Sequence, residues 1–115
     1  LFTSGSACGI CGKQSLESVE VHGPEVTSNI TVRMNIMGEL PARLRAAQPL
    51  FASTGGAHAA ALFTPAGGLV AVREDVGRHN ALDKLVGWAL AEGRVPLSDV
   101  LLLVSGRLSY ELVQK

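Results

Sequence analysis

Residues 73–84, with the sequence REDVGRHNALDK, hold most of the side chains that could do chemistry. An acid pair, an arginine, a histidine and an asparagine fall within seven positions, 74–80. Apolar runs at 69–72 and 85–90 flank the stretch, so we predict a junction between a strand and a helix. At the carboxyl end of a strand, side chains converge with the free N–H groups of the following helix. We therefore interpret this junction as one wall of a binding or reaction site.

Individual side chains in this wall have several open uses. Glu74 and Asp75 could orient a histidine, bind a ribose hydroxyl or pair with neighbouring arginines, and an ion pair is the expected use of at least one of them. His79 could be a ligand, a base or a histidine that is simply satisfied by its surroundings.

A second candidate lies at Thr54-Gly55-Gly56, ahead of His58. Glycines before a helix can cradle a phosphate, because free N–H groups there carry partial positive charge. The alternative for this short motif is a turn that requires positive φ. Arg78 and Arg107 each follow a predicted strand, and together with the glycine motif they could hold a pyrophosphate. His58 near a helix start would stay neutral and available as a base or ligand, or be a core histidine.

Cys8 and Cys11 are the only cysteines, in a C-x-x-C arrangement within the glycine-rich residues 4–13. Three functions are open: a dithiol redox pair, half of a zinc site, or an exposed nucleophile that carries sulfur as a persulfide. A zinc site would need two of the three histidines as further ligands. The loop composition favours the sulfur carrier, because that chemistry needs an accessible thiolate and Lys13 helps to lower a nearby thiol pKa. We expect a reduced, intracellular pair.

Hydrophobic periodicity indicates the elements that must position these residues. We predict helices over 35–47, from Thr54 with His58 in its first turns, over 78–91 and from 105–107 onward, with strands over 69–73 and 100–104. Strand, helix and strand from 69 to 104 form a βαβ unit, whose strands should be parallel with a right-handed crossover. Both strand exits would then meet at one edge of the sheet, where three helix N-termini would face one crevice.

Length and composition restrict the class of protein. The chain has 115 residues and a mass of 12.0 kDa, which predicts one domain over 1–115, with residues 1–14 as a flexible C-x-x-C loop within it. Its formal net charge is zero, which gives no electrostatic sign of nucleic-acid or membrane binding. No apolar run reaches the roughly 18 residues of a membrane span. The chain lacks an initiator Met and stops within a helical pattern, so we expect truncation at both ends.

Five segments together carry a family resemblance. They are CGICGK at 8–13, QPLF at 48–51, TGGAHAA at 54–60, REDVGRHNALDK at 73–84 and SGRLSYE at 105–111. In this order they resemble the FdhD family, the formate dehydrogenase accessory sulfurtransferases. The match covers nearly the whole chain, and the long central motif is highly specific.

This resemblance implies a three-layer α/β/α, cytidine-deaminase-like fold with a mixed sheet. It also implies a cytoplasmic sulfurtransferase that takes sulfur from a cysteine desulfurase and passes it to the molybdenum (or tungsten) bis-guanine-dinucleotide pterin cofactor of formate dehydrogenase. By position, Cys8 matches the persulfide carrier and Cys11 its helper or relay. A homodimer is an open expectation, and no permanently bound metal is expected. To the anionic cofactor we assign Gly55, Gly56, His58, Arg78, His79 and Arg107.

Two alternatives stay open beside the sulfurtransferase: a non-catalytic chaperone that binds the molybdenum cofactor, and a C-x-x-C zinc or redox module. Deamination is rejected. A zinc deaminase needs His-x-Glu on one helix and Pro-Cys-x-x-Cys opening the next, whereas Ala60 stands two residues after His58 and the helix at 78–91 opens without cysteine.

Overall fold

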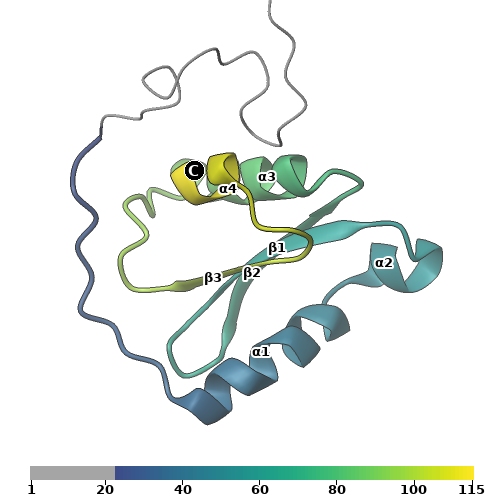
Figure 1. Ribbon diagram of the computed structural model, residues 1–115, viewed down its shortest axis with the longest axis horizontal. Coiled ribbons are helices and arrows are strands. Elements are labelled where there is room, and N and C mark those ends of the chain that lie inside the picture. The colour runs from purple at the N-terminus through teal and green to yellow at the C-terminus, as the bar shows by residue number, and fades with distance from the viewer. Residues whose placement is uncertain (1–22) are drawn as a thin grey trace, which may run out of the picture. The chain divides into compact units, whose positions relative to one another are not determined.

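The computed structural model describes residues 23–115 (Figure 1). Residues Val26–Gly106 form one compact unit, and Arg107–Lys115 belong to a second, so each is described by itself. Cys8, Cys11 and the loop predicted over 1–14 lie outside the described residues. None of the helices in 23–115 combines the length and the apolar character that crossing a membrane requires. The first unit contains α1 (Met34–Ala46), α2 (Pro49–Thr54), β1 (His58–Phe63), β2 (Leu69–Asp75), α3 (Arg78–Ala91) and β3 (Leu101–Val104), and the second contains α4 (Tyr110–Gln114).

The three strands form one sheet in the order β2-β1-β3, and β1 is antiparallel to both neighbours. β2 and β3 therefore run in the same direction, as predicted. They are not paired with each other, because β1 lies between them. The mixed sheet that the family resemblance implies is not seen in these strands, whose two ladders are both antiparallel. The strand between β2 and β3 was not predicted, because β1 had been interpreted as part of a helix.

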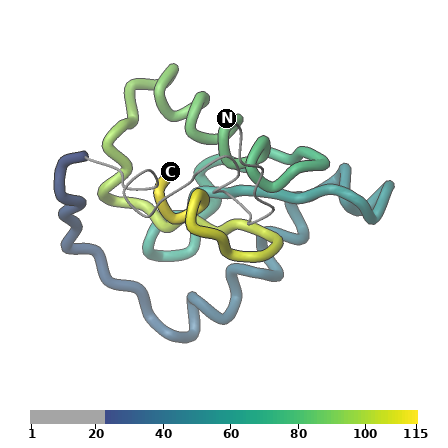
Figure 2. The backbone as a smooth tube through the Cα atoms, turned by 45° about the horizontal axis from the view of Figure 1, so that its top comes forward, coloured from purple at the N-terminus to yellow at the C-terminus, as the bar shows by residue number. Residues whose placement is uncertain are grey.

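Helices cover both faces of this sheet, which gives the first unit the expected α/β/α layers. α1 and α3 lie on opposite sides of the strands in Figures 1 and 2. On the α1 side, Leu40 and Leu44 pack in one cluster with Ala59, Ala61 and Phe63. The other β1 residues alternate to the opposite face, where α3 contributes its buried stripe of Ala81, Leu82, Leu85 and Ala89. The predicted periodicity of this helix is confirmed, with Val86 half-buried.

The helix predicted from Thr54 onward is wrong. α2 instead ends at Thr54, and Gly55 caps it in the left-handed conformation with φ 69°. His58 then begins a strand in which residues 59–63 are at most 1% exposed. Alanine has the highest helix propensity of all residues, but helix propensity is a weak determinant of structure, and tertiary burial overrides it here. Three consecutive alanines suit the strand, since short side chains let helices approach both faces of the sheet.

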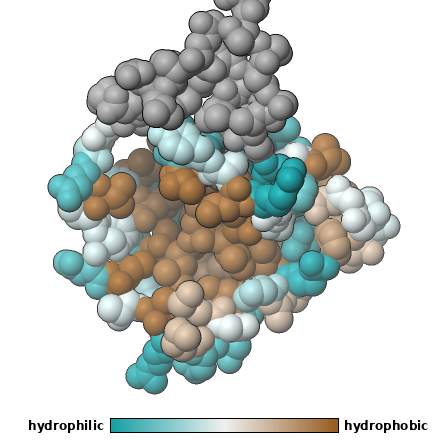
Figure 3. Space-filling view, in the orientation of Figure 1, coloured by the Kyte–Doolittle hydropathy of each residue, from teal (hydrophilic) through white to brown (hydrophobic). Residues whose placement is uncertain are grey.

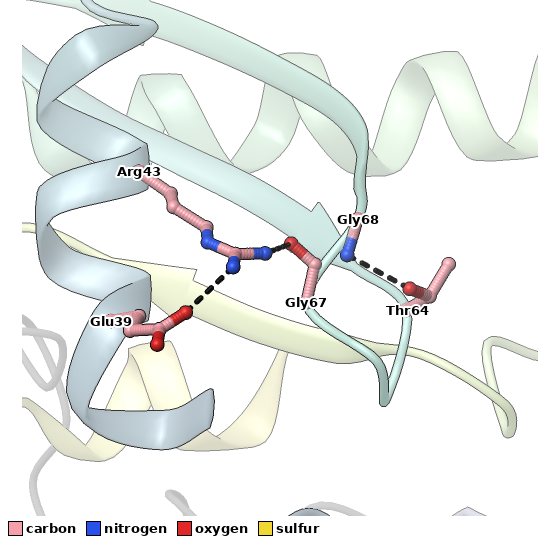
Figure 4. Close-up of polar contacts among 5 residues, drawn as sticks. All are labelled: Glu39, Arg43, Thr64, Gly67 and Gly68. Carbon is pink, nitrogen blue, oxygen red and sulfur yellow. Dashed lines mark hydrogen bonds and ion pairs between the residues drawn. The ribbon is translucent and has the colours of Figure 1, made fainter. Parts of the chain in front are cut away.

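A tight hairpin joins β1 to β2 over residues 64–68. The amide of Thr64 donates to Gly68 O (2.8 Å), and the amide of Gly68 donates to Thr64 Oγ1 (2.9 Å). Arg43 of α1 reaches this turn, donating to Gly67 O while it also pairs with Glu39 at 2.6 Å (Figure 4). The hairpin is thereby held against α1.

β3 is the less covered edge of the sheet. Leu102 is 50% exposed, and the other three residues of the strand are half-buried. Figure 3 shows apolar residues gathered over the region that β3 crosses in Figure 1. The last helix was predicted to open at 105–107, but α4 begins at Tyr110, where Ser109 Oγ accepts from the Leu112 amide at 3.3 Å.

Substituting Ala60 tests whether packing, rather than strand propensity, controls β1. Valine has the higher strand propensity, but Ala60 is 0% exposed with a helix on its face of the sheet. We expect Ala60→Val to lower the free energy of unfolding by about 1–3 kcal/mol in urea titrations, because the added methyl groups overpack the interface. Leu102→Val, at the half-exposed edge position, should change it by less than about 1 kcal/mol. A stabilised Ala60→Val protein would contradict this account of β1.

Candidate functional site

A pocket of about 290 Å³ lies at the end of the sheet where β1 begins and β3 ends. It collects residues from the last turn of α1, from α2, from the loop before β1 and from the exit of β3. The lining residues are Arg45, Gln48, Phe51, Gly55, Gly56, Ala57, His58, Ser105 and Gly106.

His58 is fixed at this end of the sheet by Ser105. Its Nδ1 lies 3.2 Å from Ser105 Oγ, and the same oxygen accepts from the Ala59 amide at 2.8 Å. The Ser105 amide donates in turn to Ala59 O at 2.9 Å. These contacts continue the β1–β3 ladder by one residue, so the imidazole position follows from the strand pairing itself.

Gly106 brings His58 and Arg78 together. Its φ is 90°, and a Cβ at this position would meet His58 Nδ1 at 3.1 Å and Arg78 Cδ at 3.2 Å. Only a glycine fits between these two side chains with this backbone. The first residue of α3 therefore lies beside the pocket, although Arg78 is not one of its lining residues.

The prediction that Gly55 and Gly56 lie at the N-terminus of a helix is wrong. Gly55 and Gly56 follow the carboxyl end of α2, where carbonyl groups carry partial negative charge. The amide of Gly55 donates to Phe51 O (2.7 Å) and that of Gly56 to Thr54 Oγ1 (3.1 Å). An anion in this pocket would thus depend on side-chain cations. Of the three helix N-termini predicted to face one crevice, that of α3 lies at this end, and α4 belongs to the second unit.

The sequence-predicted site residues divide into three groups. Gly55, Gly56 and His58 line the pocket, and Arg78 lies next to it. His79 is the second residue of α3 and does not line the pocket. Arg107 belongs to the second unit, and the two cysteines lie outside the described residues. Within residues 23–115, no three His, Cys, Asp or Glu side chains are arranged to hold a metal ion.

Sequence reasoning missed Arg45 and Phe51. The Arg45 guanidinium stacks 4.0 Å from the centroid of the Phe51 ring at the pocket wall, an arrangement that is stabilised by the ring quadrupole and keeps the charge available. Gln48 beside them is buried, at 4% exposed. The QPLF motif at 48–51 was the available signal, but nothing in its spacing assigned it a role.

Glu74 has a use that none of the sequence alternatives included. Its two carboxylate oxygens accept from the amides of Leu50 (3.0 Å) and Phe51 (2.9 Å), at the first turn of α2. These are donors that a helix start leaves unsatisfied, and a carboxylate there is favoured by the helix dipole. Glu74 therefore holds α2, and with it the wall of the pocket, against the end of β2.

Asp75 forms an ion pair, as the sequence predicted for at least one of the two acids, but its partner is Lys84 rather than a neighbouring arginine. Lys84 Nζ lies 2.7 Å from Asp75 Oδ2 and also donates to Glu74 O at 2.9 Å. The Gly77 amide (3.0 Å) and Asn80 Nδ2 (3.3 Å) donate to Asp75 Oδ1. Lys84 chiefly, then the Gly77 amide, lowers the pKa of Asp75 from 3.8 to about 2 against the opposing effect of burial.

Comparisons with known proteins place this chain in a described family. The chain is similar over 85% of its length to a crystal structure from Desulfotalea psychrophila described as a formate dehydrogenase accessory protein, with 28% identity, a TM-score of 0.64 and 40% of that chain covered. A family model for the FdhD/NarQ family matches residues 2–115. The chain belongs to the FdhD/NarQ family.

Curated relatives named sulfur carrier protein FdhD agree with this assignment. The Nocardia farcinica protein is 52% identical over 100% of this chain and 42% of its own length. The Streptomyces avermitilis protein is 56% identical over 96% of this chain and 40% of its own length. The Sulfolobus acidocaldarius protein is 44% identical over 99% of this chain and 44% of its own length. The chain thus spans about two fifths of the length of these relatives.

The lowered pKa of Asp75 predicts a contribution to stability that depends on pH. A carboxylate with a depressed folded-state pKa stabilises fully above its unfolded value of 3.8, and this contribution is lost as the pH falls through about 2. Asp75→Asn should therefore be less stable than the wild type at about pH 5, and the difference should shrink at about pH 2.5, as measured by urea midpoints.

Variants of Lys84 and Asp99 distinguish the contribution of the Asp75 ion pair from general effects of acid on stability. Between about pH 5 and pH 2.5, Lys84→Met should lose less stability than the wild type does, as Asp75→Asn should. The reason is that Lys84 is the main cause of the lowered pKa of Asp75. Asp99→Asn, in the loop before β3 and outside this network, should behave as the wild type does. Equal acid sensitivity of Asp75→Asn and the wild type would show that Asp75 contributes nothing.

Proposed function

We propose that this protein is a sulfurtransferase that carries sulfur as a persulfide on Cys8. It accepts the sulfur from a cysteine desulfurase and delivers it to the molybdenum bis-guanine-dinucleotide pterin cofactor that formate dehydrogenase requires. The observation that carries the proposal is a C-x-x-C pair, Cys8 and Cys11, within a chain that matches the FdhD/NarQ family over residues 2–115. Its relatives at about half identity are named sulfur carriers.

The proposed loading step is a thiolate displacement. The Cys8 thiolate attacks the terminal sulfur of the desulfurase persulfide, the S–S bond breaks, and the desulfurase cysteine leaves as a thiolate. In a relay, the Cys11 thiolate attacks the same terminal sulfur and Cys8 becomes the leaving thiolate. Both steps conserve atoms and electrons and need an exposed thiol. Lys13, two residues after Cys11, supplies a positive charge close to the thiols in the sequence, and a neighbouring cation favours the thiolate form.

The pocket at the start of β1 is the proposed place for an anionic part of the acceptor cofactor. Arg45 lines it and Arg78 lies beside it, and guanidinium groups bind pyrophosphate oxygens with charge-assisted hydrogen bonds. His58 is held at its wall by Ser105. Gly55 and Gly56 allow the acceptor to approach the backbone closely. His79, the second residue of α3, remains a proposed contributor to the same site. Arg107 remains a proposed cofactor-binding residue.

Further parts of the proposal rest on the same resemblance. The α/β/α layering and the strand order β2-β1-β3 support a cytidine-deaminase-like fold for the whole domain. Two cysteines without a disulfide framework fit the reducing cytoplasm. Formate dehydrogenase and a cysteine desulfurase are the proposed protein partners, and a second copy of the chain is proposed as a third.

Persulfide loading can be measured by intact mass. After incubation with a cysteine desulfurase and cysteine, the protein should gain about 32 Da, the mass of one sulfur atom, and dithiothreitol should remove it. Cys8→Ala should abolish the adduct because it removes the proposed acceptor sulfur. Cys11→Ala, the matched thiol deletion three residues away, should still load.

The outcomes separate the alternative functions. A wild-type protein that never loads but binds the cofactor would overturn the carrier in favour of the chaperone. Stoichiometric zinc in the purified protein would favour the metal module. Equal loading of Cys8→Ala and the wild type would rule out Cys8 as the carrier.

The pocket is tested by ligand binding, separately from loading. Arg78→Gln and Arg45→Gln should each weaken the binding of guanosine diphosphate by about tenfold in calorimetry, the effect of losing one charge-assisted hydrogen bond, while persulfide loading stays normal. Arg33→Gln, a charge-matched change at the exposed residue before α1, should leave binding unchanged. Unaltered binding by both pocket variants, with normal thermal unfolding, would exclude this pocket.

A further inference from the structure

Two arginines share one tryptophan on the α3 side of the sheet. The Arg73 guanidinium lies 5.8 Å from the centroid of the Trp88 ring, and the Arg94 guanidinium lies 5.3 Å from it. Arg73 extends from β2, where it pairs in register with Ala60, and Arg94 follows the end of α3. Three separate backbone segments therefore bring two positive charges to one aromatic ring.

Neither guanidinium has an acidic partner within the part of the chain that the structure describes. The ion pairs of Arg43 with Glu39, Lys84 with Asp75, and Lys115 with Glu111 do not involve Arg73 or Arg94. Arg73 Nη1 donates to Val72 O at 2.7 Å. Arg94 lies near the carboxyl end of α3, whose dipole offsets part of its charge, but Arg73 in a strand has no such compensation. Two like charges beside one ring favour an incoming anion.

A hollow adjoins Arg94. It has a volume of about 340 Å³, and Arg94 lines it together with the apolar residues Leu62, Val70, Val95, Pro96, Leu97 and Val100 and the polar residues Ser98 and Asp99. Ser28 holds its outer loop by donating to Ser98 O at 2.6 Å. Leu90 and Val95, at 61% and 49% exposed, add apolar surface nearby in the sequence. The hollow is large enough for one or two apolar side chains.

We propose that Arg73, Trp88, Arg94 and the adjoining hollow, together the tryptophan surface, bind an acidic peptide segment of a partner protein. An apolar side chain of the segment enters the hollow, and flanking carboxylates pair with the two guanidinium groups. Tryptophan and arginine are the residue types that most often dominate protein interfaces. Nucleic acid fits less well, because the chain has no net positive charge and phosphate binding uses extended basic surfaces.

The tryptophan surface is separate from the candidate functional site. Leu62 lies near the carboxyl end of β1 and Val70 near the start of β2, whereas His58 begins β1 and Ser105 follows β3. The hollow and the pocket therefore lie at opposite ends of the sheet. The inference does not depend on sulfur transfer, so either proposal can fail alone.

Trp88 provides a direct measurement, because it is the only tryptophan in the sequence. We expect a peptide of alternating Glu and Leu to change its fluorescence saturably in the full-length protein, and added salt to weaken the binding. Arg73→Gln and Arg94→Gln should each weaken it about five- to tenfold, the effect of losing one ion pair at a partly exposed site. Arg33→Gln, at the helix on the opposite face of the sheet, is the charge-matched control and should bind normally.

Matched peptides decide the chemistry. A Gln–Leu peptide tests the carboxylates and a Glu–Ser peptide tests the apolar side chains, and both should bind at least about tenfold more weakly. Equal binding of the Gln–Leu peptide, or unchanged binding by both arginine variants with normal thermal unfolding, would overturn the proposal. So would saturation by a single-stranded oligonucleotide or by phosphatidylserine vesicles while the Glu–Leu peptide has no effect.

Discussion

The complete burial of β1 is the constraint on which the described unit depends. Its residues 59–63 are at most 1% exposed, and they pair with strands on both edges and face helices on both sides. Small side chains at 59–61 set how closely α1 and α3 approach the sheet, while Phe63 fills the α1 side. His58 begins this strand, so the same pairing that buries β1 delivers an imidazole to the end of the sheet.

The sequence predicted those elements whose local pattern agrees with their final environment. The bounds of α3, 78–91, were predicted correctly because its buried residues recur with helical period. β2 and β3 were recognised from short apolar runs. β1 was missed because alanine carries no strand signal of its own, and its identity depends on two long-range pairings that no local window contains. That single error also hid the strand order, since the position between β2 and β3 had no candidate.

The sequence predicted several residues of the candidate site correctly, but not the source of its positive charge. Gly55, Gly56 and His58 do meet in one pocket, with Arg78 beside it. The supposed attraction for anions came from a helix start, but the glycines follow the end of α2. Positive charge must come instead from Arg45 and Arg78. Glu74 could not be assigned from sequence, because its partners are the amides of a helix that begins 25 residues earlier, at Pro49.

The layout of the unit separates two proposed binding regions along one helix. Arg78 opens α3 beside the pocket, and Trp88, near its end, carries the tryptophan surface. Between them the helix buries Ala81, Leu82, Leu85 and Ala89 against the sheet. Coupling between two sites requires an element that both ligands shift between alternative arrangements, and a helix packed in this way has little room to move. A partner held at the tryptophan surface would therefore leave the pocket geometry intact, which is the arrangement expected where docking and chemistry must proceed together.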